Sequence, residues 1–212
     1  METEHIYVNG EEESIREVLK TAEAYAGELG IAEKESLRLR LLSEELIGLL
    51  SGITNDDYSA MFWIDGDKKK CFLHLAGNVK MTSRRREELL ASARSGKNEA
   101  AKGIMGKLRE MIATSVLVLD ESAEIGALPI ADFYNAGMDS LAYSTGQMTW
   151  SLAGYRSTLE DRMIDLDQTD AFEDREPWDE LERSIIANLA DDVRVSIRKD
   201  DVEIVVERAF GR

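Results

Sequence analysis

The stretch from Glu35 to Gly52 constrains the fold of this chain more than any other. Its large apolar residues recur at steps of three and four, which places them on one face of an α-helix. Glu44 and Glu45 lie in the middle of this run, so their carboxylates stand either at the edge of a core or beside a cleft. The pattern predicts a helix from near Ala32 to around Gly52 that packs against another layer of structure. The apolar face consists of Leu39, Leu42, Leu46, Leu49, Leu50 and Ile53.

Segments in which apolar and polar residues alternate predict five β-strands. Asp65-Gly66 predicts a tight turn between the second and third strands, because glycine accepts the positive φ that such a turn requires. Cys71, Leu73 and Leu75 fall on one face of the third strand. We expect all five strands to share one sheet. They run over His5–Val8, Tyr58–Ile64, Lys70–Ala76, Val193–Lys199 and Val202–Arg208.

An apolar stripe from Ile15 to Leu29 predicts a helix near the beginning of the chain. Ser14 and Glu17 have the spacing of a capping box, in which each side chain satisfies a free backbone N–H of the first turn. Gly30 predicts the end of this helix, because glycine readily adopts the left-handed conformation that follows a last turn.

Helical stripes also occur later in the chain. The stripe over Ala101–Ile112 carries Gly103 and Gly106 near its start, where either a close approach to a ligand or tight helix packing would account for them. Residues 83–94 form a charged helical segment, and a further helix is expected from Pro177 through Leu189. Between these segments, residues 113–177 show mixed patterns with one strand near Met148–Leu152, which indicates an insertion.

The bulk composition excludes several classes of function. The chain has 212 residues, of which 43% are apolar and 32% charged, and this is typical of a folded domain. Its 42 acidic and 26 basic residues give a formal charge of −16, which repels a phosphate backbone, so no nucleic-acid partner is expected. The single cysteine, Cys71, permits no intramolecular disulfide and suits a reducing compartment. Without a secretory signal or an apolar run near the ~20 residues that span a bilayer, we expect a cytoplasmic protein that does not bind membranes.

The order of the predicted elements is strand, helix, helix, hairpin, glycine-bearing segment, helix and closing hairpin, which is typical of a two-layer α/β sandwich. Together with L-L-S-E-E-L-I-G at residues 41–48, this order resembles the ATP-binding domain shared by gyrase, Hsp90, histidine kinases and MutL, and most closely the anti-sigma-factor serine kinases. The resemblance covers residues 5–112 and 178–208. It implies a single histidine-kinase-type domain over residues 1–212, with a mixed, mainly antiparallel sheet covered by helices and an insertion at about 113–177.

The resemblance also implies where a nucleotide site would lie. In the family a glutamate, matched here by Glu44, is followed four residues later by an asparagine that holds Mg²⁺, and this chain has Gly48 at that place. The family's adenine-reading aspartate ends the return strand before a glycine, and here Ala76 precedes Gly77. The metal ligand and the adenine-reading carboxylate are therefore both replaced by residues that have no side-chain oxygen, Gly48 and Ala76. Asn78 is a candidate for a displaced adenine reader.

The third part of the family site is a glycine-rich lid that leads into a helix N-terminus, which favours phosphate. Lys102-Gly103 and Gly106 resemble this lid loosely. The candidate nucleotide cleft therefore comprises Glu44, Glu45, Gly77, Asn78, Lys102, Gly103 and Gly106.

The missing groups indicate a regulatory or protein-interaction protein built on a degenerate ATPase-like domain, without ATP hydrolysis, without a metal and with another protein as its partner. Formation of a homodimer is left open. Two alternatives also stay open. One is an active serine kinase or ATPase that uses ATP and Mg²⁺, with Glu44 as its general base. The other is a binder of a different small anionic ligand.

The two histidines, His5 and His74, do not have the spacing of a zinc site with Cys71. We expect His74 to lie on one face of the sheet.

Overall fold

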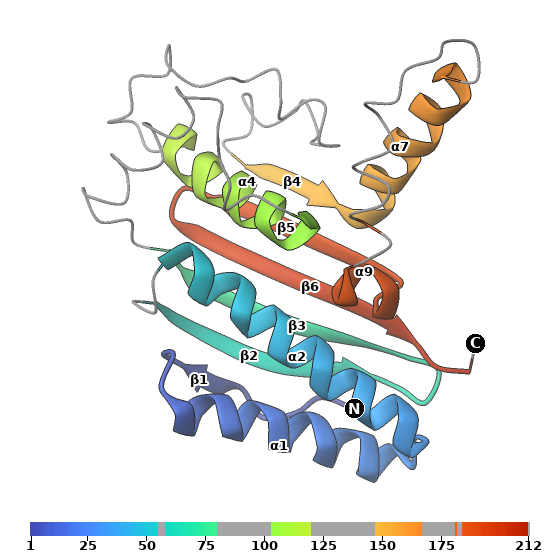
Figure 1. Ribbon diagram of the computed structural model, residues 1–212. Helices are drawn as coiled ribbons and strands as arrows, with labels where there is room; N and C mark the ends of the chain where they lie inside the picture. Colours follow the sequence, from blue (N-terminus) through green and yellow to red (C-terminus); the bar gives the residue numbers. More distant parts are fainter. Residues whose placement is uncertain (55–57, 80–102, 120–146, 167–180, 182–183, 212) are drawn as a thin grey trace.

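A computed structural model describes residues 1–54, 58–79, 103–119, 147–166, 181 and 184–211 (Figure 1). Its centre is a six-stranded sheet in the order β1–β2–β3–β6–β5–β4, in which all neighbouring strands pair antiparallel. The five predicted strands all lie in this sheet, and β4, from the predicted insertion, extends it beside β5. The strands are β1 (Ile6–Val8), β2 (Ser59–Gly66), β3 (Lys70–Asn78), β4 (Met148–Ser151), β5 (Asp192–Arg198) and β6 (Asp201–Ala209).

Helices cover one face of the sheet, which confirms a two-layer α/β fold (Figure 1). The central helix α2 (Glu33–Thr54) packs between α1 (Glu12–Leu29) on one side and α4 (Gly103–Leu119) on the other. The short helix α9 (Ile185–Leu189) also contacts α2, and α7 (Leu152–Leu166) follows β4 directly and packs on β4 and β5. The opposite face of the sheet, called the open face below, is not covered by a helix of the described part of the chain.

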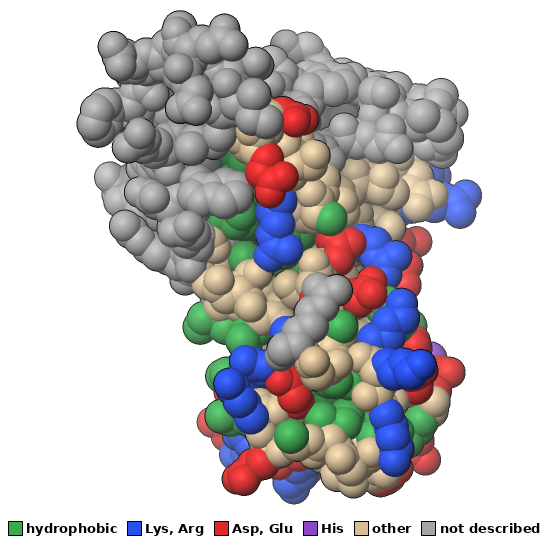
Figure 2. Space-filling model, turned by 90° about the vertical axis from the view of Figure 1, so that its right-hand side faces the viewer, with side chains coloured by type: hydrophobic (Ala, Val, Ile, Leu, Met, Phe, Trp, Pro, Cys, Tyr) green, Lys and Arg blue, Asp and Glu red, His purple; other side chains and the backbone are tan. Residues whose placement is uncertain are grey.

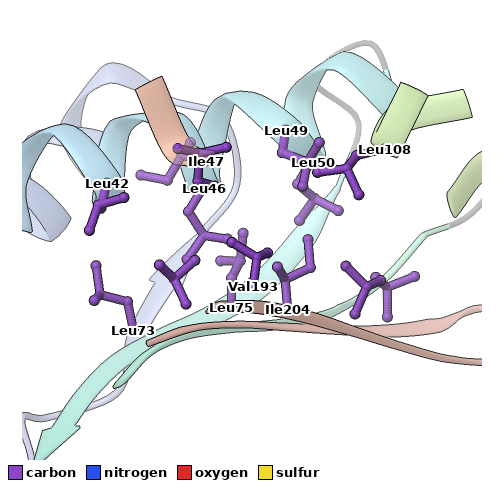
Figure 3. Packing of buried hydrophobic residues seen from close by; sticks show 14 of the residues in the cluster. Leu42, Leu46, Ile47, Leu49, Leu50, Leu73, Leu75, Leu108, Val193 and Ile204 are labelled. Atoms are coloured by element: carbon purple, nitrogen blue, oxygen red, sulfur yellow. The ribbon is translucent and has the colours of Figure 1, made fainter. Parts of the chain in front are cut away.

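The core lies between α2 and the sheet, and the predicted apolar face of α2 is confirmed. All six residues of that face are at most 2% exposed. Leu42, Leu46 and Leu49 point down toward side chains of β3, β5 and β6 (Figure 3). Full burial of each leucine side chain contributes about 1.5–3 kcal/mol to the stability of the domain.

The start of α1 differs from the expected capping box. The helix begins at Glu12, and its N-cap residue Glu11 makes no side-chain capping bond. Ser14 lies inside the helix, where its single hydroxyl proton has two acceptors, the Glu11 carbonyl oxygen at 2.9 Å and Asn9 Oδ1 at 3.0 Å. The capping-box prediction is therefore wrong, since the chain enters α1 through a turn held by Asn9. The predicted end is confirmed, because Gly30 has a φ of 65°.

The helix expected to run from Pro177 through Leu189 is also corrected. Ser184 is extended, with a φ of −79° and a ψ of 126°, so a continuous helix cannot pass through it. Its hydroxyl oxygen accepts from the Ala187 N–H at 3.3 Å and thereby begins α9 as a separate helix. The predicted helix at residues 83–94 lies outside the described residues.

A buried ion pair joins the beginning of α2 to the end of β6. Arg208 Nε and Nη2 donate to Glu35 Oε2 at 3.1 and 2.9 Å, and Arg208 Nη1 donates to the Leu189 carbonyl oxygen at 2.8 Å. Arg38 donates to the other oxygen of Glu35. This network fixes α2 and α9 over the sheet.

Candidate functional site

The predicted nucleotide cleft was expected beside α2, and the structure places its two glutamates there. Glu44 is exposed, and Glu45 is half-buried. Gly48 follows Glu44 by four residues and therefore lies one helical turn further on, on the same side of α2. A Cβ atom at Gly48 would meet nothing within 4 Å, so an asparagine there would not be excluded by its Cβ.

Arg109 of α4 lies across this part of α2. Its Nη2 donates to the Gly48 carbonyl oxygen at 2.9 Å. A Cβ on Gly52 would lie 2.7 Å from Arg109 Cζ and 2.8 Å from Arg109 Cδ, so the absence of a side chain at Gly52 makes room for the arginine. The space near the expected metal ligand thus holds a guanidinium group. Sequence reasoning missed Arg109, because the residue is one of several charged groups on its helix and only the packing of α4 on α2 selects it.

The end of β3 does not converge on Glu44. Ala76 pairs with Met61 and Glu203 in a row of side chains on the open face, because it alternates with the buried residues Leu75 and Cys71. A carboxylate at Ala76 would therefore lie on the opposite side of the sheet from α2. The pattern of Cys71, Leu73 and Leu75 already contained this signal.

Gly77 and Asn78 continue the alternation of β3 residues between the helix-covered face and the open face of the sheet. A Cβ on Gly77 would lie 2.6 Å from the Ser59 carbonyl oxygen and 2.7 Å from Ala60 Cβ, so close packing of β2 on β3 requires glycine here. The Asn78 amide nitrogen donates to Asp201 Oδ1 at 3.1 Å, on the open face. Asn78 and Glu44 consequently face different sides of the sheet.

Of the three predicted lid residues, the structure describes the position of two, Gly103 and Gly106. Lys102 lies outside the described residues, Gly103 is the first residue of α4, and Gly106 is buried within that helix. The structure therefore brings Glu44 and Glu45 together on α2 but does not bring Asn78 to them.

The described residues form a groove of about 680 Å³ on the open face. It follows two rows of side chains that run across the strands. The first row carries Tyr7, Met61, Ala76, Glu203 and Ser196, which are neighbours in the sheet register. The second row carries Ser59, Asn78, Asp201 and Arg198, with Gln147 beside them.

Small side chains line the middle of the groove. Ala76 and Ser196 form its floor in the first row. The next row on the open face carries Trp63, His74, Val205 and Arg194.

A stack of aromatic rings borders the groove. The Trp63 ring lies between His5 and His74, with ring centroids 4.5 and 4.6 Å away and interplanar angles of 11° and 6°. His5 Nε2 lies 3.0 Å from Glu2 Oε1, and His74 Nε2 lies 2.8 Å from Asp65 Oδ2. His74 is on a sheet face as expected. Three segments of the chain build this stack, which holds the N-terminal residues against β2.

The charges around the sheet are mixed. On the side of the molecule where the β2–β3 turn and the C-terminus lie, basic and acidic side chains are interspersed (Figure 2). Lys70 Nζ lies 3.5 Å from Glu207 Oε1, and Arg194 Nη2 lies 3.7 Å from Glu207 Oε2. Within the groove, Asp201 and Glu203 on β6 adjoin Arg198 on β5.

Cys71 and Tyr25 are buried in the core, where burial opposes ionisation of their side chains. Burial raises the pKa of the Cys71 thiol to about 12, so the thiol stays neutral and poorly nucleophilic at neutral pH. Burial also raises the pKa of the Tyr25 hydroxyl well above its ordinary value.

No group of histidine, cysteine and carboxylate side chains in the described residues has the arrangement of a metal site. Among the helices that the structure describes, none is long and apolar enough to cross a membrane. Neither a family model, nor a curated protein, nor a solved structure matches this chain.

Proposed function

We propose that this chain is a regulatory protein-interaction module built on a degenerate ATPase-like domain, and that it acts without hydrolysing ATP. The observation that carries the proposal is the position of Arg109. Its guanidinium group donates to the Gly48 carbonyl oxygen and covers Gly52, beside the place where the resembled family holds its metal.

A guanidinium group in this position opposes the chemistry of a magnesium nucleotide. Mg²⁺ requires a nearly octahedral set of oxygen ligands, and Gly48 offers only a carbonyl oxygen that already accepts a hydrogen bond from a cation. The positive charge of Arg109 also repels a divalent metal ion. Glu44 could still act as a base, but Ala76, at the position of the family's adenine-reading aspartate, has no carboxylate and faces away from α2.

The open face of the sheet supports the proposal that the chain binds a protein partner. The open face carries a groove of about 680 Å³, and Tyr7 and Met61 at its edge are 57% and 36% exposed. Exposed aromatic and methionine side chains are enriched at protein–protein interfaces. Partner binding therefore does not depend on the decayed cleft beside α2.

Calorimetric titration with Mg-ATP tests the proposal. We expect no saturable heat up to millimolar nucleotide, since a dissociation constant of 1 mM corresponds to only about −4.1 kcal/mol. Saturable binding by the unmutated chain that is lost in Glu44→Ala, but kept in the exposed control Glu28→Ala, would reject the proposal and favour the ATP-dependent enzyme. The control removes one carboxylate from α1 without touching α2.

A further inference from the structure

We infer that the groove on the open face binds an extended segment of a partner protein, which presents an apolar, then a cationic and then an anionic side chain along the line from β1 to β5. The inference rests on the proposed function, because it specifies the partner of that interaction module.

The length of the groove fits a short extended peptide. Its rows cross β1, β2, β3, β6 and β5, which are four strand spacings and therefore about 19 Å. An extended chain advances about 3.3 Å per residue, so seven residues span about 20 Å. Side chains that point to the same side of such a peptide are separated by two, four or six residues.

The first end of the groove is apolar. Tyr7 on β1 and Met61 on β2 are neighbours in the sheet register and keep much of their surface exposed. An apolar side chain placed between them would remove that surface from water, which stabilises the complex by about 25 cal/mol for each Å² buried.

The middle of the groove is rich in hydrogen-bond acceptors. Asp201 and Glu203 lie on the same face of β6, about 7 Å apart. Asn78 donates its amide nitrogen to Asp201 Oδ1 at 3.1 Å. Glu203 is 49% exposed, and its Oε1 lies 3.9 Å from His74 Nδ1. These acceptors suit the ammonium group of a lysine side chain.

The far end of the groove is basic. Arg198 on β5 is exposed, and its guanidinium makes no ion pair with a carboxylate of the described residues. It lies one strand spacing, about 5 Å, beyond the acids of β6, so it can pair with an anionic group that follows the lysine by two residues. The apolar, acidic and basic parts of the groove therefore occur in a fixed order.

This order favours a peptide over the other occupants. A nucleic acid carries only negative charge, and the net charge of −16 opposes both a polyanion and a second copy of the chain. The three complementary side chains of the partner segment alternate with positions that face solvent, as an extended backbone requires.

Two peptides of equal composition and zero side-chain charge test the inference. The matching peptide is acetyl-Leu-Ser-Ser-Ser-Lys-Ser-Glu-amide, and the control exchanges its lysine and glutamate. Because both are neutral, the overall charge of the protein does not distinguish them. We titrate each into the ¹⁵N-labelled protein to millimolar concentration and follow the backbone amide shifts.

We expect the matching peptide to shift amides of Tyr7, Ala76 and Glu203 and to bind about tenfold more tightly than the control peptide, since two favourable ion pairs replace two repulsive ones. The variant Asp201→Asn/Glu203→Gln should reduce this preference to the part that the ion pair with Arg198 contributes. The variant Glu17→Gln/Glu28→Gln changes the net charge equally on α1, outside the groove, and should keep it.

Equal binding of both peptides, no binding, or shifts confined to residues outside the groove would overturn the inference. So would shifts of the groove amides that depend on protein concentration alone, because they would assign the groove to a second copy of the chain. These failures are distinct from failure of the proposed function, which only tight, Glu44-dependent binding of Mg-ATP would show.

Discussion

Gly52 and Gly48 lie one turn apart in α2, and we predict that replacing them by alanine has opposite effects on stability. A Cβ at Gly48 would meet nothing within 4 Å, whereas a Cβ at Gly52 would overlap the Arg109 side chain. Alanine in a helix interior is more favourable than glycine by about 0.5–1 kcal/mol. Gly48→Ala should therefore raise the free energy of unfolding by about that amount.

At Gly52 the same gain is opposed by two losses. Inserting a methyl group into a filled space costs about 1–3 kcal/mol, and displacing the guanidinium removes its hydrogen bond to the Gly48 carbonyl oxygen. A hydrogen bond from a charged group contributes about 1.5–3 kcal/mol. Because Arg109 is a long side chain that can partly move aside, we expect Gly52→Ala to lower the free energy of unfolding by about 1–2 kcal/mol.

Urea unfolding followed by circular dichroism measures both changes, and an unchanged m-value shows that the comparison is valid. The double variant Arg109→Ala/Gly52→Ala provides the decisive control. With Arg109 shortened, the added methyl group has room, so Gly52→Ala should become neutral or stabilising in that background. If Gly52→Ala stabilises the protein as much as Gly48→Ala does, Arg109 does not occupy this space and the main support for the proposed function is lost.

Two further predictions concern the core. Leu46→Ala should lower the free energy of unfolding by about 2–5 kcal/mol, because Leu46 is fully buried between α2 and the sheet, and a melting curve equal to that of the unmutated protein would refute this packing. Cys71 should not react with thiol reagents in the native protein. The rate at which such a reagent modifies Cys71 should rise only when urea unfolds the chain. Because burial raises the pKa of its thiol from 9.0 to about 12, the unfolded chain releases the proton first, and the contribution of Cys71 to stability should fall as the pH rises above 9. Rapid modification of Cys71 at neutral pH in the folded protein would contradict its burial.

Much of the fold follows from patterns that are local in the sequence. The steps of three and four among the leucines of α2 identify the buried face of that helix, and alternation identifies the strands that enter the sheet. These predictions succeed because a helix or strand presents its side chains with a fixed period. The start of α1 was misplaced for a related reason. Several nearby residues can satisfy the first turn, and the choice of Asn9 and Glu11 depends on how the chain leaves β1.

The candidate site was predicted less well, and part of the missing information was already in the sequence. Alternation along β3 places Ala76 and Asn78 opposite to Leu75, so neither residue can share a cleft with Glu44. The family resemblance rests on the order of motifs and does not include the direction in which their side chains point.

The sequence by itself determined where apolar residues recur with the spacing of a helix or a strand. This spacing decides which residues enter the core and which face of each element remains exposed. Only the tertiary structure decided what lies beside those faces. Arg109 meets Gly48 and Gly52 because α4 packs on α2 at one particular register, and no local period contains that register. The groove and the His5–Trp63–His74 stack arise in the same way, from strands that are distant in sequence and adjacent in the sheet. Contacts of this kind depend on how whole elements fit together, because packing minimises voids over the entire interface and not within any one segment.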